Sequence, residues 1–341
     1  MKKKVVLTGM RTTGVLHLGH YVGALKQWID VQNTGEYECY FLLADVQALT
    51  THANNPALLT RSIREVVLDW LSVGLDPINL PYVHFVQQSQ VPERHELSIL
   101  LGMVARYGEV MRDPTLKSEL EHQSDASMGF LYYPVDQIAD IHMVDPMAQG
   151  AELLVPVGED QLPHLELARE VARRANHMYG TSFTPCDGLV GHIGRLVGTD
   201  GNSKMSKSMG NTINLSDDDK TISKAINGMP IDPTRSGKGG HTKPGDPDKT
   251  VAFIYHRAFN PNIDEVAEME ELYRTGNIGD GDVKKRLKEV LAEFLAPIRA
   301  RRAQYDNANL AEIVLDGTMA ARDACRPVVA SLRESMHLLL P

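Results

Sequence analysis

Short apolar runs that fit β-strands alternate with helical patterns through the first half of the chain. Strands are expected at 5–7, 39–44, 82–86 and 153–157, and helices at 21–31, 56–73, 92–105 and 164–176. Strands that are separated by helices pair in parallel, and the helices then cover both faces of the sheet. We therefore predict an α/β fold with a doubly wound, Rossmann-like parallel sheet over residues 1–215.

The strand patterns stop at residue 216, and helices are expected in the remainder. Their predicted ranges are 217–227, 251–259, 263–275 and 282–305, with a last helix after Asn307. This pattern predicts a C-terminal all-helical domain over residues 216–341. It contains a basic loop at 235–245 and a run of Lys and Arg side chains between Lys284 and Arg302. Such a run is usually a solvated face, and contact with RNA phosphates is the competing interpretation.

A glycine-rich turn, Thr8–Gly23, follows the first expected strand. Its glycines let backbone N–H groups approach an anion, and the start of the next helix adds favourable partial charge. The glycine spacing fits neither the dinucleotide fingerprint nor a lysine-ended P-loop. The turn instead holds His17-Leu-Gly-His20, whose imidazoles could stabilise charge on a transferring phosphoryl group. Metal ligation is disfavoured because no third ligand lies nearby, and simple capping of the helix is the structural alternative.

A second polar motif, Lys204-Met-Ser-Lys-Ser208, lies in the glycine- and serine-rich stretch 198–211. This composition predicts a mobile surface loop. Two lysines and two hydroxyls on such a loop could close over a polyphosphate. Alone, the loop would be interpreted as merely solvated, and its occurrence downstream of the histidine turn favours the phosphate interpretation.

Polar side chains also interrupt two apolar segments. On a helix begun at Pro134, Tyr133, Gln137 and Asp140 would share one face. A buried carboxylate is costly without a donor, so Asp140 needs either an internal partner or a ligand, and the residues favour neither. The stretch 158–161 follows a strand and suits ribose hydroxyls or a substrate ammonium, with a helix cap by Asp160 as the alternative.

Composition excludes several classes of protein. A formal net charge of −9 argues against nucleic-acid binding through a uniformly basic face. The three cysteines are far apart, which excludes a disulfide framework and a four-cysteine metal or iron–sulfur site. With no secretory or membrane-spanning apolar segment, we expect a cytoplasmic protein with no membrane partner.

Together, His17-Leu-Gly-His20 and Lys204–Ser208 resemble the two signature motifs of the class I aminoacyl-tRNA synthetases, and the second matches letter for letter. The chain is similar in particular to the bacterial tryptophanyl group of that family. That similarity is carried by the following segments: 14–28, 85–96, 154–169, 204–213 and 274–302.

The resemblance implies a catalytic domain at 1–215 and an anticodon-binding domain at 216–341. It implies a homodimer that activates L-tryptophan with ATP, releases pyrophosphate and transfers the aminoacyl group to tRNA(Trp). Mg²⁺ would be held mainly by the ATP phosphates, with no metal ligands from the protein. His17, His20, Lys204 and Lys207 would stabilise the transition state.

The resemblance also assigns binding residues. Those matching ATP contacts are Arg11, Thr12, Thr13, Gly19, His20, Gly158, Glu159, Asp160, Leu196, Lys204, Met205, Ser206, Lys207 and Ser208. Those matching the amino-acid pocket are Gln47, Tyr133, Gln137, Asp140 and Gln161. Within this pocket, Asp140 would accept a hydrogen bond from the indole N–H, and Tyr133 and Gln161 would lie near the ammonium.

Three positions depart from the commonest tryptophanyl pattern and indicate a divergent branch. His20 stands where asparagine is common, Gln47 where histidine is frequent and Gln137 where methionine is frequent. The spacing of Tyr133, Gln137 and Asp140 is also similar to the tyrosyl family's pocket, so tyrosine specificity is the main alternative. A non-catalytic paralogue with an RNA-binding or regulatory role is another. A small-molecule nucleotidyltransferase is disfavoured by the lysine loop and the helical region.

Overall fold

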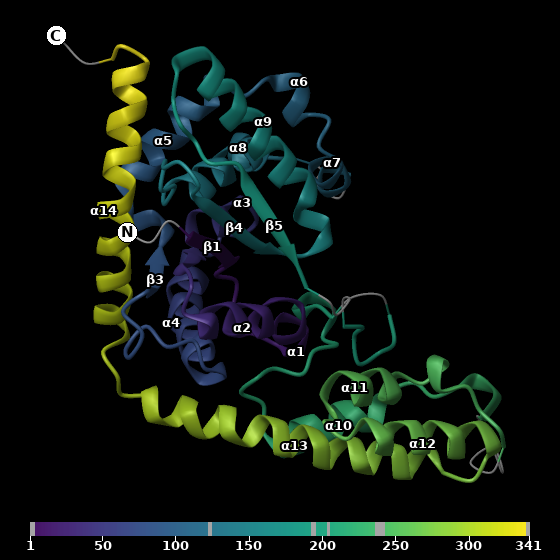
Figure 1. Cartoon of the computed structure of the whole chain (residues 1–341). Helices are drawn as coiled ribbons and strands as arrows, with labels where there is room; N and C mark the ends of the chain where they lie inside the picture. The colour runs from purple at the N-terminus through teal and green to yellow at the C-terminus, as the bar shows by residue number, and fades with distance from the viewer. Residues whose placement is uncertain (1–3, 122–124, 192–195, 203–204, 236–242, 339–341) are drawn as a thin grey trace.

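A five-stranded parallel sheet forms the centre of the molecule (Figure 1). The computed structural model describes residues 4–121, 125–191, 196–202, 205–235 and 243–338. The strands are β1 (Lys4–Arg11), β2 (Glu38–Ala44), β3 (Val83–Gln87), β4 (Glu152–Val157) and β5 (Cys186–Val190), in the order β3-β2-β1-β4-β5. Every neighbouring pair is parallel, so the predicted α/β fold is confirmed. Strand β5 was not predicted, because Asp187 and Gly188 interrupt its apolar run.

Helices follow each strand as the alternation predicts. Between residues 18 and 179 they are α1 (Leu18–His20), α2 (Lys26–Thr34), α3 (Asp45–His52), α4 (Pro56–Val73), α5 (Pro92–Gly102), α6 (Tyr107–Val110), α7 (Pro114–Leu120), α8 (Met128–His142) and α9 (Leu162–Tyr179). A π-helical segment, Tyr21–Leu25, joins α1 to α2. The C-terminal helices are α10 (Asp219–Gly228), α11 (Val251–Phe259), α12 (Ile263–Thr275), α13 (Asp280–Tyr305) and α14 (Leu310–Ser335).

Alternate residues of each strand enter the core on opposite faces of the sheet. On one face, Val6 and Phe41 join a cluster with Trp28 of α2 and Trp70 of α4, and this cluster continues into α10–α13. On the other face, strand residues such as Leu42 pack against α5, α8, α9 and the later turns of α14. Both faces are therefore covered, which explains the continuous apolar runs 39–44 in β2 and 153–157 in β4.

One expected helix start was wrong. Helix α8 begins at Met128 and not at Pro134, which lies inside it. Ser127 caps the helix, and its hydroxyl accepts a hydrogen bond from the backbone N–H of Phe130. Burial of one face of α8, together with this cap, offsets the cost of the proline inside the helix.

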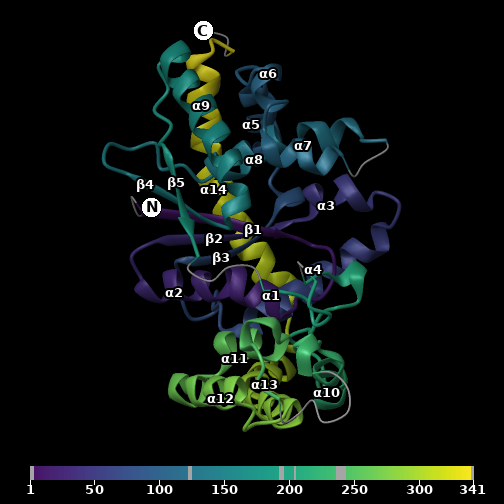
Figure 2. The same cartoon turned by 90° about the vertical axis from the view of Figure 1, so that its right-hand side faces the viewer.

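Helices α13 and α14 connect the helical region to the sheet (Figures 1 and 2). Helix α13 packs against α10 and α11 in its first half and against α4 further along, and α14 then runs beside edge strand β3. A Cβ atom on Gly317 would lie 2.3 Å from the carbonyl oxygen of Phe85, so this contact requires glycine. Thr318 Oγ1 accepts a hydrogen bond from the N–H of Gln87 at 3.0 Å, so α14 protects the sheet edge.

The division into a domain at 1–215 and a helical domain at 216–341 stays a prediction. Helix α14 belongs to the second range by sequence, yet it packs against strand β3 of the sheet. In the described part of the chain, no helix combines the length and the apolar character needed to cross a membrane.

Candidate active site

A pocket of about 390 Å³ opens at the carboxyl ends of β1 and β4. Strands β2 and β4 flank β1 on opposite sides, so the chain changes direction here, as it does at ligand sites of doubly wound sheets. The β1–β4 pairing extends only over Lys4–Val6, after which Thr8 Oγ1 donates to the Pro156 carbonyl at 2.7 Å. Ten predicted site residues line this pocket: Arg11, Gly19, His20, Gln47, Tyr133, Gln137, Asp140, Gly158, Asp160 and Gln161.

Other predicted residues lie outside its lining. They are Thr12, Thr13, His17, Glu159, Leu196, Met205, Ser206, Lys207 and Ser208, and Lys204 falls outside the described residues. Leu196 and Met205 are buried in the core, where the N–H of Met205 donates to the Leu196 carbonyl at 3.4 Å. Their burial anchors the backbone next to Lys207 in the core.

The histidine turn has a defined geometry. The backbone N–H of His17 donates to Nδ1 of His20 at 3.1 Å, and the ring centroids are 3.8 Å apart. Because Nδ1 of His20 accepts this bond, its proton resides on Nε2, which can then donate to a ligand. Two imidazoles this close disfavour a state in which both are charged. The turn is therefore suited to donate a hydrogen bond to a phosphate oxygen.

The lysine motif contacts this turn directly. Lys207 Nζ donates to the Thr13 carbonyl at 3.2 Å, and a Cβ on Gly14, whose φ is 114°, would lie 3.3 Å from the same Nζ. Burial lowers the pKa of Lys207 to about 8, and the nearby charge of Asp69 opposes that shift. The side chain is thus packed, and not solvated, beside the phosphate-binding turn.

Asp69, which the sequence analysis did not single out, anchors the other side of the turn. Its fully buried carboxylate accepts the N–H of Leu16 at 2.7 Å and pairs with Arg302 of α13. Burial raises the pKa of Asp69 to about 6, against the effects of Arg302 and the Leu16 N–H. An acidic residue within the apolar stretch 66–71 was the only sequence signal.

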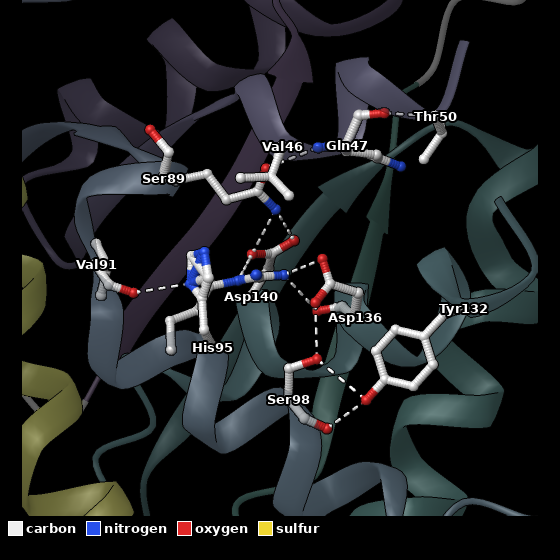
Figure 3. A network of polar contacts seen from close by, with 12 residues as sticks. Val46, Gln47, Thr50, Ser89, Val91, His95, Ser98, Tyr132, Asp136 and Asp140 are labelled. Atoms are coloured by element: carbon white, nitrogen blue, oxygen red, sulfur yellow. Dashed lines mark hydrogen bonds and ion pairs between the residues drawn. The ribbon is translucent and has the colours of Figure 1, made fainter. Parts of the chain in front are cut away.

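Asp140 lies in a buried polar network beneath the pocket (Figure 3). Its carboxylate accepts from Nε2 of Gln88 at 2.9 and 3.0 Å and from Nε of Arg94 at 2.6 Å. Arg94 also pairs with Asp136, which accepts from the Ser98 hydroxyl at 2.7 Å. Burial raises the pKa of Asp140 to about 6, while Arg94 opposes the rise. The sequence left open whether Asp140 has an internal partner or a ligand, and the structure contains the internal donors Gln88 and Arg94. The carboxylate also lines the pocket and retains lone pairs that a ligand could use.

Gln88 and Arg94 are site residues that sequence reasoning missed. Gln88 is fully buried, and its Oε1 accepts the N–H of Gln47 at 3.1 Å, which connects Gln47 to Asp140. Gln88 lies two residues after the expected strand 82–86, which was a usable signal. Arg94 sits on a helix with ordinary charged neighbours, so nothing in the sequence indicated that it is 1% exposed.

Tyr133 belongs to a second network at the pocket rim. Its Oη donates to Oε2 of Glu119 at 2.7 Å and lies 3.3 Å from Nε2 of His164. Gln137 Oε1 is buried and has no hydrogen-bond partner among the described residues. Gln161 Nε2 donates to the Asp160 carboxylate at 3.2 Å.

Comparison with known proteins agrees with this geometry. Residues 1–296 match the family described as tRNA synthetases class I (W and Y). The tryptophan–tRNA ligase of Treponema pallidum is 42% identical over 339 residues, covering 98% of this chain and 96% of that protein. The ligase of Chlamydia caviae is 43% identical over 309 residues, covering 89% and 86%. The crystal structure of tryptophanyl-tRNA synthetase from Campylobacter jejuni, complexed with ADP and tryptophan, superposes with a TM-score of 0.82 at 29% identity, covering 98% of this chain and 99% of that one. The chain therefore belongs to the class I tRNA synthetases of the tryptophan and tyrosine group.

Proposed function

We propose that this protein activates L-tryptophan with ATP, forming tryptophanyl adenylate and pyrophosphate, and then transfers the tryptophanyl group to tRNA(Trp). The observation that carries the proposal is the contact of Lys207 with the histidine turn, beside a pocket that contains a buried carboxylate. Five relatives that are 39–43% identical to this chain are named tryptophan–tRNA ligases, which favours tryptophan over tyrosine. Intact histidine and lysine motifs favour a catalyst over a non-catalytic paralogue.

The chemistry requires positioning and charge stabilisation more than covalent catalysis. The carboxylate of tryptophan attacks the α-phosphorus of ATP in line, and pyrophosphate leaves. His20 donates from Nε2 to the phosphate oxygens, His17 fixes the tautomer of His20 through its N–H, and Lys207 neutralises charge that develops on the pyrophosphate. We extend the same role to Lys204 from the resemblance alone.

The remaining ATP contacts follow the layout of the pocket. Arg11 and Gly19 line its phosphate side, at the end of β1 and the start of α1. The turn from Gly158 to Asp160 lies at the end of β4, where its acceptors suit the ribose hydroxyls. Thr12, Thr13, Leu196, Ser206 and Ser208 lie outside the pocket lining, and we assign them to the ATP site from the resemblance alone.

Mg²⁺ would arrive with ATP in this proposal. Among the described residues, no group of three or more His, Cys, Asp or Glu side chains could hold a metal ion. The oxygen ligands that Mg²⁺ prefers are then supplied mainly by the phosphates.

Asp140 would select the amino acid. Its carboxylate is fixed by Gln88 and Arg94, and in the proposal it accepts the indole N–H through a remaining lone pair. Phenylalanine offers no such donor and would leave that acceptor without a ligand partner, so discrimination against it should be strong. Gln47 lies beside this network, and Gln161, which also lines the pocket, would help to bind the ammonium.

tRNA would bind through residues 216–341, although most of the basic run on α13 is engaged within the chain. Lys284 donates to the carbonyls of Asn227 and Met229, and Arg301 donates to that of Ser72. Further side chains of this run pair with acidic residues: Arg286, Arg299 and Arg302. These pairs leave fewer of its charges for RNA phosphates than the sequence suggested.

The proposal also includes a homodimer and a cytoplasmic location. Ile99, Met103 and Tyr107 are 55%, 72% and 80% exposed on neighbouring segments, and a second copy could cover them. The three free, buried cysteines suit a reducing compartment. Sedimentation of the wild-type protein and a Met103→Glu variant tests the dimer, which the variant should dissociate.

Two assays test the function. Purified protein with ATP and a tRNA pool should attach labelled tryptophan to tRNA, and neither tyrosine nor phenylalanine should be attached at a comparable rate. Single-turnover adenylate formation should fall about 100-fold or more in His20→Ala, as for loss of one transition-state donor. The exposed His177→Ala serves as the matched control. Adenylate formation at the wild-type rate in His20→Ala would refute the assignment.

A further inference from the structure

Glu119 lies at the end of α7 and lines the pocket, yet no sequence pattern singled it out. Its carboxylate accepts the hydrogen bond from Tyr133 Oη at 2.7 Å. The side chain is half-buried, so it is neither a solvated surface charge nor part of the core. A carboxylate in this position favours a ligand that carries a cationic group.

A chain of hydrogen bonds holds α7 over the pocket. Asp113 caps the helix by accepting from the N–H groups of Thr115 and Leu116 at 2.9 and 3.0 Å. Its other oxygen lies 2.8 Å from Nδ1 of His164, whose Nε2 is close to Tyr133 Oη. Thr115 Oγ1 also donates to the Asp160 carbonyl at 2.8 Å. Glu119 is therefore positioned by contacts at both ends of its helix.

Glu119 makes no ion pair with another side chain in the described part of the chain. Asp140, which is buried and also lines the pocket, is paired with Arg94. For Glu119 no ion pair with Lys, Arg or His occurs among the described residues, and its contact is to the neutral Tyr133 hydroxyl. A cationic group of a ligand would supply the missing partner.

Gln137 provides a second acceptor at the same place. It follows Tyr133 by four residues, so the two side chains share a face of α8. Its buried Oε1 has no partner among the described residues, and an acceptor left in this state costs free energy until a donor arrives. Glu119, Tyr133 and Gln137 thus offer a carboxylate, a phenol and an amide oxygen to one ligand group.

We propose that Glu119 is a specificity-determining residue that binds the α-ammonium of the amino-acid substrate, with Gln137 Oε1 as the second acceptor. The inference rests on the proposed function, since it requires an amino acid in this pocket. An ammonium has one positive charge and three N–H donors, so it can bind the carboxylate of Glu119 and neighbouring neutral acceptors at the same time. The site would then distinguish amino acids from indole acids that lack the amino group.

Isothermal titration calorimetry with two ligands tests this role. The ligands are L-tryptophan and indole-3-propionic acid, which lacks only the α-amino group, and the proteins are wild type, Glu119→Gln and the exposed control Glu121→Gln. Glutamine keeps an acceptor for Tyr133 and removes the charge. We expect L-tryptophan to bind about 10- to 100-fold more weakly to Glu119→Gln, from the loss of a charge-assisted bond. Indole-3-propionic acid should bind the two proteins equally.

Either of two results would overturn the inference: unchanged L-tryptophan affinity in Glu119→Gln, or an equal loss for both ligands. Adding L-tyrosine separates the inference from the proposed function. If wild type bound tyrosine and not tryptophan, with the same dependence on Glu119, the specificity would be wrong and the role of Glu119 would stand. Wild-type protein that bound no amino acid would refute both.

Discussion

Replacing Arg302 with methionine should destabilise the protein strongly, because it leaves the buried charge of Asp69 without its partner. Arg302 reaches from α13 to pair with Asp69 and Glu65, and Asp69 is 0% exposed. Breaking one partner from a buried pair costs about 3–5 kcal/mol, whereas methionine retains much of the packing of the arginine stem. We expect a loss in this range in the free energy of unfolding at neutral pH.

The loss of unfolding free energy in Arg302→Met should become larger as pH rises. Asp69 has an ordinary pKa of 3.8 and a folded-state pKa of about 6, so the folded state binds its proton more tightly than the unfolded state. Wild-type stability from this group therefore falls as pH rises from about 4 to 6 and is level above that. Without Arg302 the folded-state pKa of Asp69 rises further, so the variant continues to lose stability as pH rises above 6.

Urea denaturation at pH 6, 7 and 8, followed by circular dichroism, measures the effect. The exposed Arg274→Met, which removes a surface pair, should cost no more than about 1 kcal/mol. The double variant Asp69→Asn, Arg302→Met should recover most of the loss and the pH dependence, because asparagine can still accept the Leu16 N–H. Equal stability of Arg302→Met and wild type, or a loss independent of pH, would refute the reasoning.

Three further predictions follow from the site and the fold. The kcat/KM for ATP should fall as pH rises through about 8, where Lys207 loses its charge, and Lys207→Arg should move that limb to higher pH in a pH-rate profile. The affinity for tryptophan, measured by calorimetry from pH 5 to 8, should fall below about pH 6 because Asp140 becomes protonated. An affinity that does not change with pH would contradict the role of the Asp140 charge. Gly317→Ala should lower stability by about 1–3 kcal/mol in thermal or urea unfolding, because its Cβ would meet the Phe85 backbone, whereas Gly281→Ala on α13 has no neighbour within 4 Å and is the control.

Elements with strong local signals were predicted within a few residues. Helix α4 has a capping Asn55, Pro56 at its first position and Gly74 in the left-handed conformation after its end, and its predicted range 56–73 is correct. The start of α8 was wrong because Pro134 resembled a start signal more strongly than Ser127. Strand β5 was missed because it contains polar residues and therefore has no continuous apolar run. It is a strand because it pairs with β4, and that pairing cannot be recognised from the local sequence.

The pocket residues that were predicted lie next to strand ends or within known motifs, and both signals are local. The missed ones depend on distant partners. Arg94 pairs across 46 positions with Asp140, and Asp69 pairs across 233 positions with Arg302. Sequence spacing carries no information about such contacts, so Arg302 was assigned to a basic helix face and Glu119 to no role at all.

Amino-acid-dependent ATP–pyrophosphate exchange, run separately with each common amino acid, tests the central claim most directly. The account predicts exchange with tryptophan and no comparable exchange with tyrosine or phenylalanine. Exchange driven by tyrosine would retain the mechanism and contradict the role of Asp140 in specificity. Absence of exchange with every amino acid would contradict the account as a whole.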